Sequence, residues 1–239
     1  MSGVKGKLTL VTGGTSGFGK ATAKLLVEEG AEVIIASIDS EEVLKNVKAK
    51  IGCKDYIQMD VTCPVDWEEA YRYVKEKYGR LDMLLNIAGG GVSIKETTEQ
   101  SVEDIDKIIM LNLNSVIYGS RLFGKMMKEQ KVGTIINFAS VCAKEAWPEW
   151  TVYAAAKWGV LGFSKGLYVE LQPHNVRVTC VVPSAASTGF QKGAGIGAVE
   201  LKLKPENIAR VVVDVCKLPE HVVVEEVTVW GIDQIVNPL

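Results

Sequence analysis

Two side chains on one predicted helix could carry acid–base chemistry. Tyr153 and Lys157 are four residues apart in the stretch Thr151–Gly162. On a helix this spacing places them on one face, one turn apart. A lysine ammonium beside a phenol favours the phenolate and lowers the pKa of the tyrosine, which can then exchange a proton with an alcohol or carbonyl oxygen. The same spacing also fits an ordinary Tyr–Lys pair on a solvated helix face.

A glycine-rich loop lies between the first predicted strand, Lys7–Thr12, and a helical pattern from about residue 20 to 29. In that position, glycines allow a tight turn and let the helix N-terminus approach a pyrophosphate. A turn that closes the strand–helix unit without binding a ligand is the alternative. The predicted cofactor contacts of this loop are Gly13, Thr15, Ser16, Gly17, Phe18 and Gly19.

The end of the second predicted strand bears on the choice of cofactor. Glu32–Ser37 is a mostly apolar run typical of a buried parallel strand, and Ile38 and Asp39 follow it. In nucleotide-binding sheets this position contacts the adenosine ribose. Ser37, Ile38 and Asp39 include no cation to pair with a 2′-phosphate, and a carboxylate repels one, so the sequence favours NAD over NADP. Asp39 could instead cap the helix that begins near Glu41.

Two further strand ends supply candidate cofactor contacts. Asp60 and Val61 follow the strand Asp55–Met59. The Asp60 carboxylate could accept a hydrogen bond from an adenine amino group, or it could cap the next turn. After the strand Leu81–Leu85, small residues would let the backbone approach the cofactor. The candidates at this end are Asn86, Ala88 and Gly89.

The order of the elements predicts the fold class. Apolar strands alternate with amphipathic helices six times, which indicates an α/β fold with a Rossmann-like, doubly wound parallel sheet of about seven strands. Residues 1–239 read as one domain, with a substrate-side flap around 184–204. The long helix Val102–Met127 contains Asn112, a poor helix former that can bend the helix by bonding to backbone.

Composition excludes several classes of function. The 239 residues are 47% hydrophobic, enough for a large core, and the net charge of −2 leaves no footprint for nucleic acid or an anionic membrane. No apolar run reaches the ~18 residues that span a bilayer, and the first residues lack the apolar core of a signal peptide. Five scattered cysteines and two distant histidines, His174 and His221, favour a cytoplasmic protein with reduced thiols and no metal site.

The motifs, in this order, resemble those of the short-chain dehydrogenases/reductases over essentially the whole chain. The stretch Pro183–Thr188 looks like that family's Pro-Gly-x-x-x-Thr, with Ser184 in place of the glycine. The segment Val222–Trp230 is similar to the branch of 3-hydroxy acid and serine dehydrogenases. That branch often carries arginines after the second strand, where this chain has Ile38 and Asp39, so the substrate of the branch does not transfer. The other matching residues are Thr12, Gly13, Gly17, Gly19, Asn86, Ala88, Gly89, Asn112, Ser140, Tyr153 and Lys157.

The resemblance implies a role for each matching residue. Tyr153 would be the general acid/base, with Lys157 lowering its pKa and holding the nicotinamide ribose. Ser140 would bond the substrate oxygen, and Asn112 would hold a water that links Lys157 to solvent. In the cofactor site, the loop glycines would cradle the pyrophosphate, Asp60 would meet adenine, Asn86 would flank the adenosine part, and Thr188, after Pro183, would bond the nicotinamide amide.

The segment before Tyr153 should line the substrate pocket. Cys142, Trp147 and Trp150 lie there beside Ser140, and Phe190 could close the pocket from the flap. Two tryptophans favour an apolar or aromatic ketone or secondary alcohol. They could instead pack in the core or in a subunit interface of the homodimer or homotetramer that the resemblance implies. A non-catalytic nucleotide-binding sensor or scaffold is the alternative function.

Overall fold

Residues 3–190 and 201–234 are those that the structure, a computed structural model, describes. Within them, seven parallel strands form one sheet in the order β3-β2-β1-β4-β5-β6-β7, which confirms the predicted doubly wound arrangement. The order reverses between β1 and β4, because the chain first winds outward to β3 and then returns to the other side of β1. The strands are β1 Leu8–Thr12, β2 Glu32–Ser37, β3 Asp55–Gln58, β4 Met83–Asn86, β5 Gly133–Phe138, β6 Val176–Pro183 and β7 Glu226–Val229.

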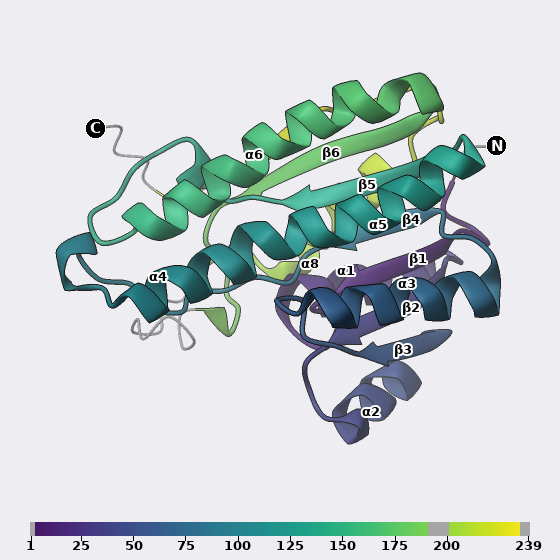
Figure 1. Ribbon diagram of the computed structural model, residues 1–239, viewed down its shortest axis with the longest axis horizontal. Helices are drawn as coiled ribbons and strands as arrows, with labels where there is room; N and C mark the ends of the chain where they lie inside the picture. Colours follow the sequence, from purple (N-terminus) through teal and green to yellow (C-terminus); the bar gives the residue numbers. More distant parts are fainter. Residues whose placement is uncertain (1–2, 191–200, 235–239) are drawn as a thin grey trace.

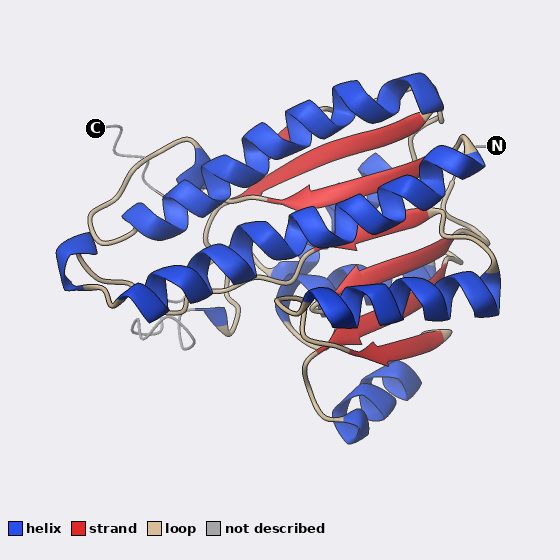
Figure 2. Ribbon diagram, viewed as in Figure 1, coloured by secondary structure: helices blue, strands red, loops and turns tan. Residues whose placement is uncertain are grey.

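Helices cover both faces of the sheet (Figures 1 and 2). One hydrophobic cluster joins the sheet to α3, α5 and α6, and another joins it to α1, α2 and α8. The interior strands β1, β4, β5 and β6 are buried along their whole length, as continuous apolar runs predict. The helices are α1 Gly17–Glu28, α2 Glu41–Ile51, α3 Pro64–Tyr78, α4 Val102–Ile109, α5 Ser115–Gln130, α6 Thr151–Leu171 and α8 Pro205–Cys216.

The predicted long helix from Val102 to Met127 is interrupted. A π-helical turn at Met110–Asn114 separates α4 from α5, and α5 continues to Gln130. The Asn112 side chain lies within this turn and donates a hydrogen bond to the Ile108 carbonyl oxygen at 3.1 Å, so it competes with the helical backbone pattern.

The last strand, predicted near Val222–Val229, begins at Glu226. Residues 191–200 of the proposed flap around 184–204 lie outside the described residues. All five cysteines are free thiols in the structure. In the described part of the chain, no helix combines the length and apolarity needed to cross a membrane.

A carboxylate at the start of β3 is tied to α3. Asp55 Oδ2 accepts hydrogen bonds from the hydroxyls of Tyr73 and Tyr78, each at 2.6 Å, and from Lys77 Nζ at 2.8 Å. Burial alone raises the pKa of Asp55, but the hydrogen bonds from Lys77 and the two tyrosines outweigh it and lower the pKa to about 2. The group therefore stabilises the fold while it is ionised.

Replacing Asp55 by Asn should lower the free energy of unfolding at pH 7 by about 2 kcal/mol. Because the folded-state pKa lies below the ordinary value of 3.8, this contribution is complete above about pH 4 and is lost as the pH falls toward 2. Denaturant unfolding at several pH values checks this, with Asp214→Asn, at an exposed position of α8, as the control. A gap between wild type and Asp55→Asn that stays constant from pH 7 to pH 2 would contradict it.

Candidate active site

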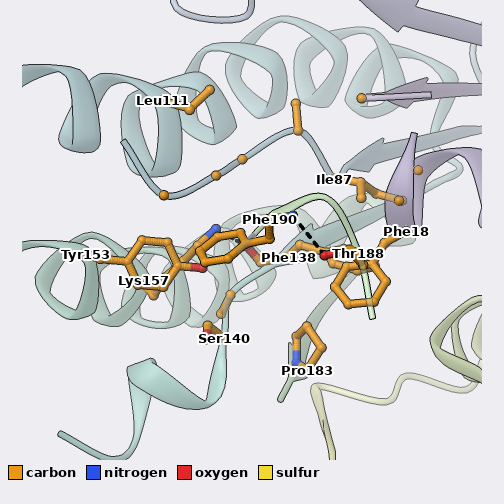
Figure 3. A pocket seen from close by; sticks show the side chains of 18 of the residues that line it. Phe18, Ile87, Leu111, Phe138, Ser140, Tyr153, Lys157, Pro183, Thr188 and Phe190 are labelled. Carbon is orange, nitrogen blue, oxygen red and sulfur yellow. Dashed lines mark hydrogen bonds between the residues drawn. The ribbon is translucent and has the colours of Figure 1, made fainter. Parts of the chain in front are cut away.

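The carboxyl ends of the strands meet at one edge of the sheet, because all seven described strands are parallel. A cavity of about 1330 Å³ lies at this edge. The glycine-rich loop after β1, the loops after β2 and β4, the segment after β5, α6 and the segment after β6 all line it (Figure 3). One cavity therefore joins the predicted nucleotide loop to the predicted catalytic helix.

The backbone of the glycine-rich loop requires glycine. Gly13 and Gly17 have φ angles of +67° and +49°, in the left-handed region. A Cβ on Gly19 would lie 2.2 Å from the Gly13 carbonyl oxygen. Ser16, the N-cap of α1, makes no side-chain cap hydrogen bond, so the first amides of this helix point to the cavity side without a side-chain acceptor. This cradle fits a pyrophosphate.

Asp39 is fixed against the glycine-rich loop. Its Oδ2 accepts hydrogen bonds from Thr15 Oγ1 at 2.5 Å and from Ser37 Oγ at 2.9 Å. The alternative that Asp39 caps α2 is wrong, because Ser40 is the N-cap and its side chain accepts the Val43 N–H. The carboxylate therefore sets a negative charge behind the end of β2.

Asp60 makes the turn predicted as its alternative role. Its Oδ1 accepts hydrogen bonds from the Thr62 N–H at 2.8 Å and from the Thr62 hydroxyl at 2.7 Å. The residue nevertheless lines the cavity together with Val61 and Met59. Asp60 thus stabilises the turn and also lines the cavity.

Asn112 holds the loop after β4. Its Nδ2 donates to the Gly90 carbonyl oxygen at 2.9 Å, and its Oδ1 accepts the Gly90 N–H at 3.1 Å. A Cβ on the neighbouring Gly89 would lie 3.0 Å from Asn112 Oδ1 and 3.4 Å from Lys157 Nζ. Glycine at position 89 therefore lets this loop approach both side chains.

Tyr153 and Lys157 share one face of α6, as their spacing predicts, and both are buried, with 6% and 3% of their surface exposed. The solvated-pair alternative is therefore wrong. Lys157 Nζ lies 5.7 Å from the centre of the Tyr153 ring and donates a hydrogen bond to the Phe138 carbonyl oxygen at 3.0 Å. Ser140, just after β5, is in hydrogen-bond contact with Tyr153.

Burial dominates the protonation of both groups. It raises the pKa of the Tyr153 phenol well above its ordinary value of 10, and the hydrogen bond with Ser140 only partly opposes this shift. It lowers the pKa of the Lys157 ammonium to about 8. The expectation that Lys157 lowers the pKa of Tyr153 is wrong for this structure, because desolvation of the phenolate outweighs any attraction to the amine.

Aromatic rings close the side of the cavity next to Tyr153. The Trp150 ring lies 5.5 Å from the Tyr153 ring, edge-on, and 6.0 Å from the Phe190 ring, nearly parallel to it. Trp147 packs in the same apolar cluster, and all four rings line the cavity. Trp147 and Trp150 thus line the cavity and pack on a hydrophobic cluster at the same time.

Comparison with known proteins decides the family. The family described as short chain dehydrogenase matches residues 7–196. An uncharacterized oxidoreductase of Staphylococcus aureus strain USA300 is 34% identical over 226 residues, which cover 93% of this chain and 96% of the relative. The chain belongs to the short-chain dehydrogenase/reductase family.

Solved structures of similar proteins contain nicotinamide cofactors of both kinds. The closed form of a serine dehydrogenase complexed with NADP+ has a TM-score of 0.89 at 28% identity and covers 97% of this chain and 98% of its own. A 3-ketoacyl-(acyl-carrier-protein) reductase from Brucella melitensis complexed with NADH has a TM-score of 0.85 at 28% identity, with coverages of 94% and 98%. This short-chain dehydrogenase/reductase is therefore an oxidoreductase with the fold of nicotinamide-binding relatives.

Most predicted site residues of this short-chain dehydrogenase/reductase line its cavity, but four are not among the described residues that line it: Thr15, Asp39, Asn86 and Asn112. Thr15, Asp39 and Asn112 lie outside the lining and hold residues of the cavity wall through the hydrogen bonds given above. The Asn86 Nδ2 donates to Ser120 Oγ at 3.1 Å and to Asn137 Oδ1 at 2.9 Å inside the protein. These hydrogen bonds join β4 to α5 and β5, and a contact of Asn86 with the adenosine part stays a prediction.

The sequence reasoning missed several wall residues. Phe138 lies at the end of β5, two positions before Ser140, and its apolar strand gave no signal of a site. Met110 and Leu111 face the cavity from the π-helical turn, which the sequence predicted only as a bend at Asn112. The stretch after β7 contributes Trp230 and Gln234, which only the tertiary fold brings to this edge.

The buried ammonium of Lys157 makes a pH-dependent contribution to stability. Its folded-state pKa of about 8 lies below the ordinary value of 10.5, so the unfolded chain binds more protons between these values and the wild type gains stability there as the pH rises. Lys157→Met lacks this term. Between about pH 7.5 and 9.5 the variant should lose about 2 kcal/mol of unfolding free energy relative to wild type. Denaturant unfolding without added cofactor measures this, and parallel curves for the two proteins would refute the burial of a charged amine.

Proposed function

We propose that this protein is an NAD(H)-dependent oxidoreductase that interconverts a secondary alcohol and the corresponding ketone, on an apolar or aromatic substrate. The observation that carries the proposal is the single cavity that joins the Gly13–Gly19 loop to Ser140, Tyr153 and Lys157. A binding module has no need of a buried phenol in contact with a serine hydroxyl at the end of its nucleotide cavity.

In this proposal, the side chains of the protein handle one proton. The hydroxyls of Tyr153 and Ser140 bind the carbonyl oxygen of the substrate and orient the carbonyl carbon. A bound nicotinamide supplies or accepts the hydride at that carbon. During reduction Tyr153 gives its proton to the forming alkoxide, and during oxidation the phenolate takes the proton from the alcohol. Burial favours the protonated phenol, which suits reduction near neutral pH.

The residues of the cavity fit a dinucleotide along its length. The Gly13–Gly19 loop would hold the pyrophosphate, and Ser37, Ile38, Asp60 and Val61 would hold the adenosine end. Ala88 and Gly89 would pass beneath the middle of the cofactor. Lys157 would bond the nicotinamide ribose, and Pro183 and Thr188 would meet the nicotinamide amide.

The preference for NAD rests on charge at the adenosine end. Asp39 is held by Thr15 and Ser37 directly behind that end, and Ile38, which lines the cavity, is 68% exposed where a cation would be needed for a 2′-phosphate. A phosphate at the ribose would face the Asp39 carboxylate without a compensating cation from Ser37, Ile38 or Asp39.

Self-association belongs to the same proposal. Trp158 and Val169 on α6 are 54% and 70% exposed, although large apolar side chains on a helix are usually covered. A homodimer or homotetramer would bury them. The cytoplasmic location expected from the five thiols stays a prediction.

Tyr153→Phe should retain NADH binding and lose at least about 100-fold in kcat for the best substrate of a panel of ketones and secondary alcohols. The change removes one hydroxyl and leaves the ring packing intact. Absorbance of the reduced nicotinamide measures turnover, and fluorescence titration measures NADH binding. The control is Tyr168→Phe on the same helix. Tyr168 is partly buried and packs on the hydrophobic cluster that joins the sheet to α3, α5 and α6. Wild-type turnover in Tyr153→Phe would show that the proton comes from elsewhere.

Wild-type kcat/KM should favour NADH over NADPH, and Asp39→Asn should reduce that preference about tenfold. Asparagine keeps an acceptor for Thr15 and Ser37 and removes only the charge. Ile38→Arg, which adds the missing cation, should raise kcat/KM for NADPH. A wild-type enzyme that prefers NADPH would overturn this account of the cofactor while leaving the proposed reaction intact.

A further inference from the structure

Three rings form a corner at the catalytic end of the cavity. The Phe190 ring lies nearly parallel to the Trp150 ring, with an interplanar angle of 10° and ring centres 6.0 Å apart. It also lies edge-on to the Tyr153 ring, with ring centres 5.7 Å apart. Figure 3 shows the Phe190 ring beside Tyr153. An aromatic ring therefore already occupies the place beside the hydroxyl that is proposed to transfer the proton.

Two sides of this corner are fixed by the backbone. Trp150 is the N-cap of α6, its N–H donates to the Trp147 carbonyl oxygen at 3.3 Å, and its own carbonyl oxygen accepts the Ala154 N–H at 2.7 Å. The preceding Glu149 has a φ of +70°, a backbone conformation that residues other than glycine rarely adopt. The chain thus accepts backbone strain immediately before the residue whose ring forms the wall.

The third ring is attached differently. Phe190 lies on the segment after β6, and its N–H donates a hydrogen bond to Thr188 Oγ1 at 3.2 Å. Its side chain is only half-buried. Rotation about the Cα–Cβ bond would remove the Phe190 ring from the corner without breaking that backbone hydrogen bond. Trp150 and Tyr153 would keep their positions.

The surroundings of the corner select an apolar ring as its occupant. The buried members of the cluster are Ile108, Cys142, Val152, Tyr153 and Ala154, and the partly buried hydrophobic side chains packed on them include Trp147 and Trp150. A flat ring gains from stacking on the Trp150 face and from the edge-on contact with Tyr153, as Phe190 does. A saturated ring of the same size gains area but not this stacking.

We propose that the substrate is an aryl ketone or the matching secondary aryl carbinol, and that its ring stacks on Trp150 in the place now held by the Phe190 ring. The inference rests on the proposed reduction, because in an aryl ketone the ring is bonded directly to the carbonyl carbon. A carbonyl oxygen at the hydroxyls of Tyr153 and Ser140 then brings that ring next to the Tyr153 ring. Phe190 is a gate that the substrate ring displaces, and Trp150 is the specificity-determining wall.

Acetophenone and cyclohexyl methyl ketone test the inference, because they have the same skeleton and differ in the aromaticity of the ring. With NADH, wild-type kcat/KM should favour acetophenone about fivefold, the value of one aromatic pair. Trp150→Leu should bring this ratio to about one. Phe190→Ala should lower KM for acetophenone, because no ring competes for the corner. The control Val43→Leu, at an exposed position of α2 outside the cavity lining, should leave both ketones unchanged.

Three results would overturn the inference: an active wild type without aryl preference, a Trp150→Leu variant that slows both ketones equally, or a Phe190→Ala variant with a raised KM for acetophenone. Calorimetry of 1-phenylethanol binding to the protein–NADH complex separates this failure from that of the proposed function. Binding that Trp150→Leu weakens, without turnover of either ketone, would refute the reaction and keep the ring site. Absence of both binding and turnover would refute both.

Discussion

The buried ammonium of Lys157 is the interaction on which the rest of the site depends. It lies inside the protein with the Phe138 carbonyl oxygen as its hydrogen-bond acceptor, at the carboxyl end of β5. An amine in this position is costly to desolvate, and the fold accepts the cost because α6 packs along β6 with Lys157 and Tyr153 on its inner face. The same burial keeps the phenol of Tyr153 protonated, so one packing arrangement sets the charge state of both groups.

The remaining elements make room for this pair. Asn112 bends the chain between α4 and α5 and holds the Gly90 backbone, and glycine at position 89 lets that loop pass close to Lys157 Nζ. On the opposite side, Ser184 Oγ, which replaces the family's glycine, accepts the Gly231 N–H at 3.3 Å. That hydrogen bond joins the segment after β6 to the stretch that brings Trp230 to the cavity. The Ser184 side chain thus connects two segments that line the cavity.

Local sequence patterns were sufficient for the strands, the glycine-rich loop and the shared face of Tyr153 and Lys157, because each depends on periodicity or on backbone conformation. These patterns did not predict features that depend on residues far apart in the sequence. The polar partners of Asn86 come from α5 and β5, and its strand-end position gave no indication of these hydrogen bonds. The pKa of Tyr153 follows from burial by rings as distant in sequence as Phe190, whereas the spacing to Lys157 alone indicated a shift in the opposite direction.

The pH dependence of kcat/KM in both directions tests the role of the buried phenol most directly. Reduction needs the protonated phenol and oxidation needs the phenolate. With the pKa of Tyr153 raised by burial, reduction of a ketone should stay level from about pH 6 to 7.5, where Lys157 is still charged, while oxidation of the alcohol should rise about tenfold per pH unit over the same range. Oxidation that is level across this range, or reduction that falls through neutral pH, would contradict a phenol kept protonated at the centre of the site.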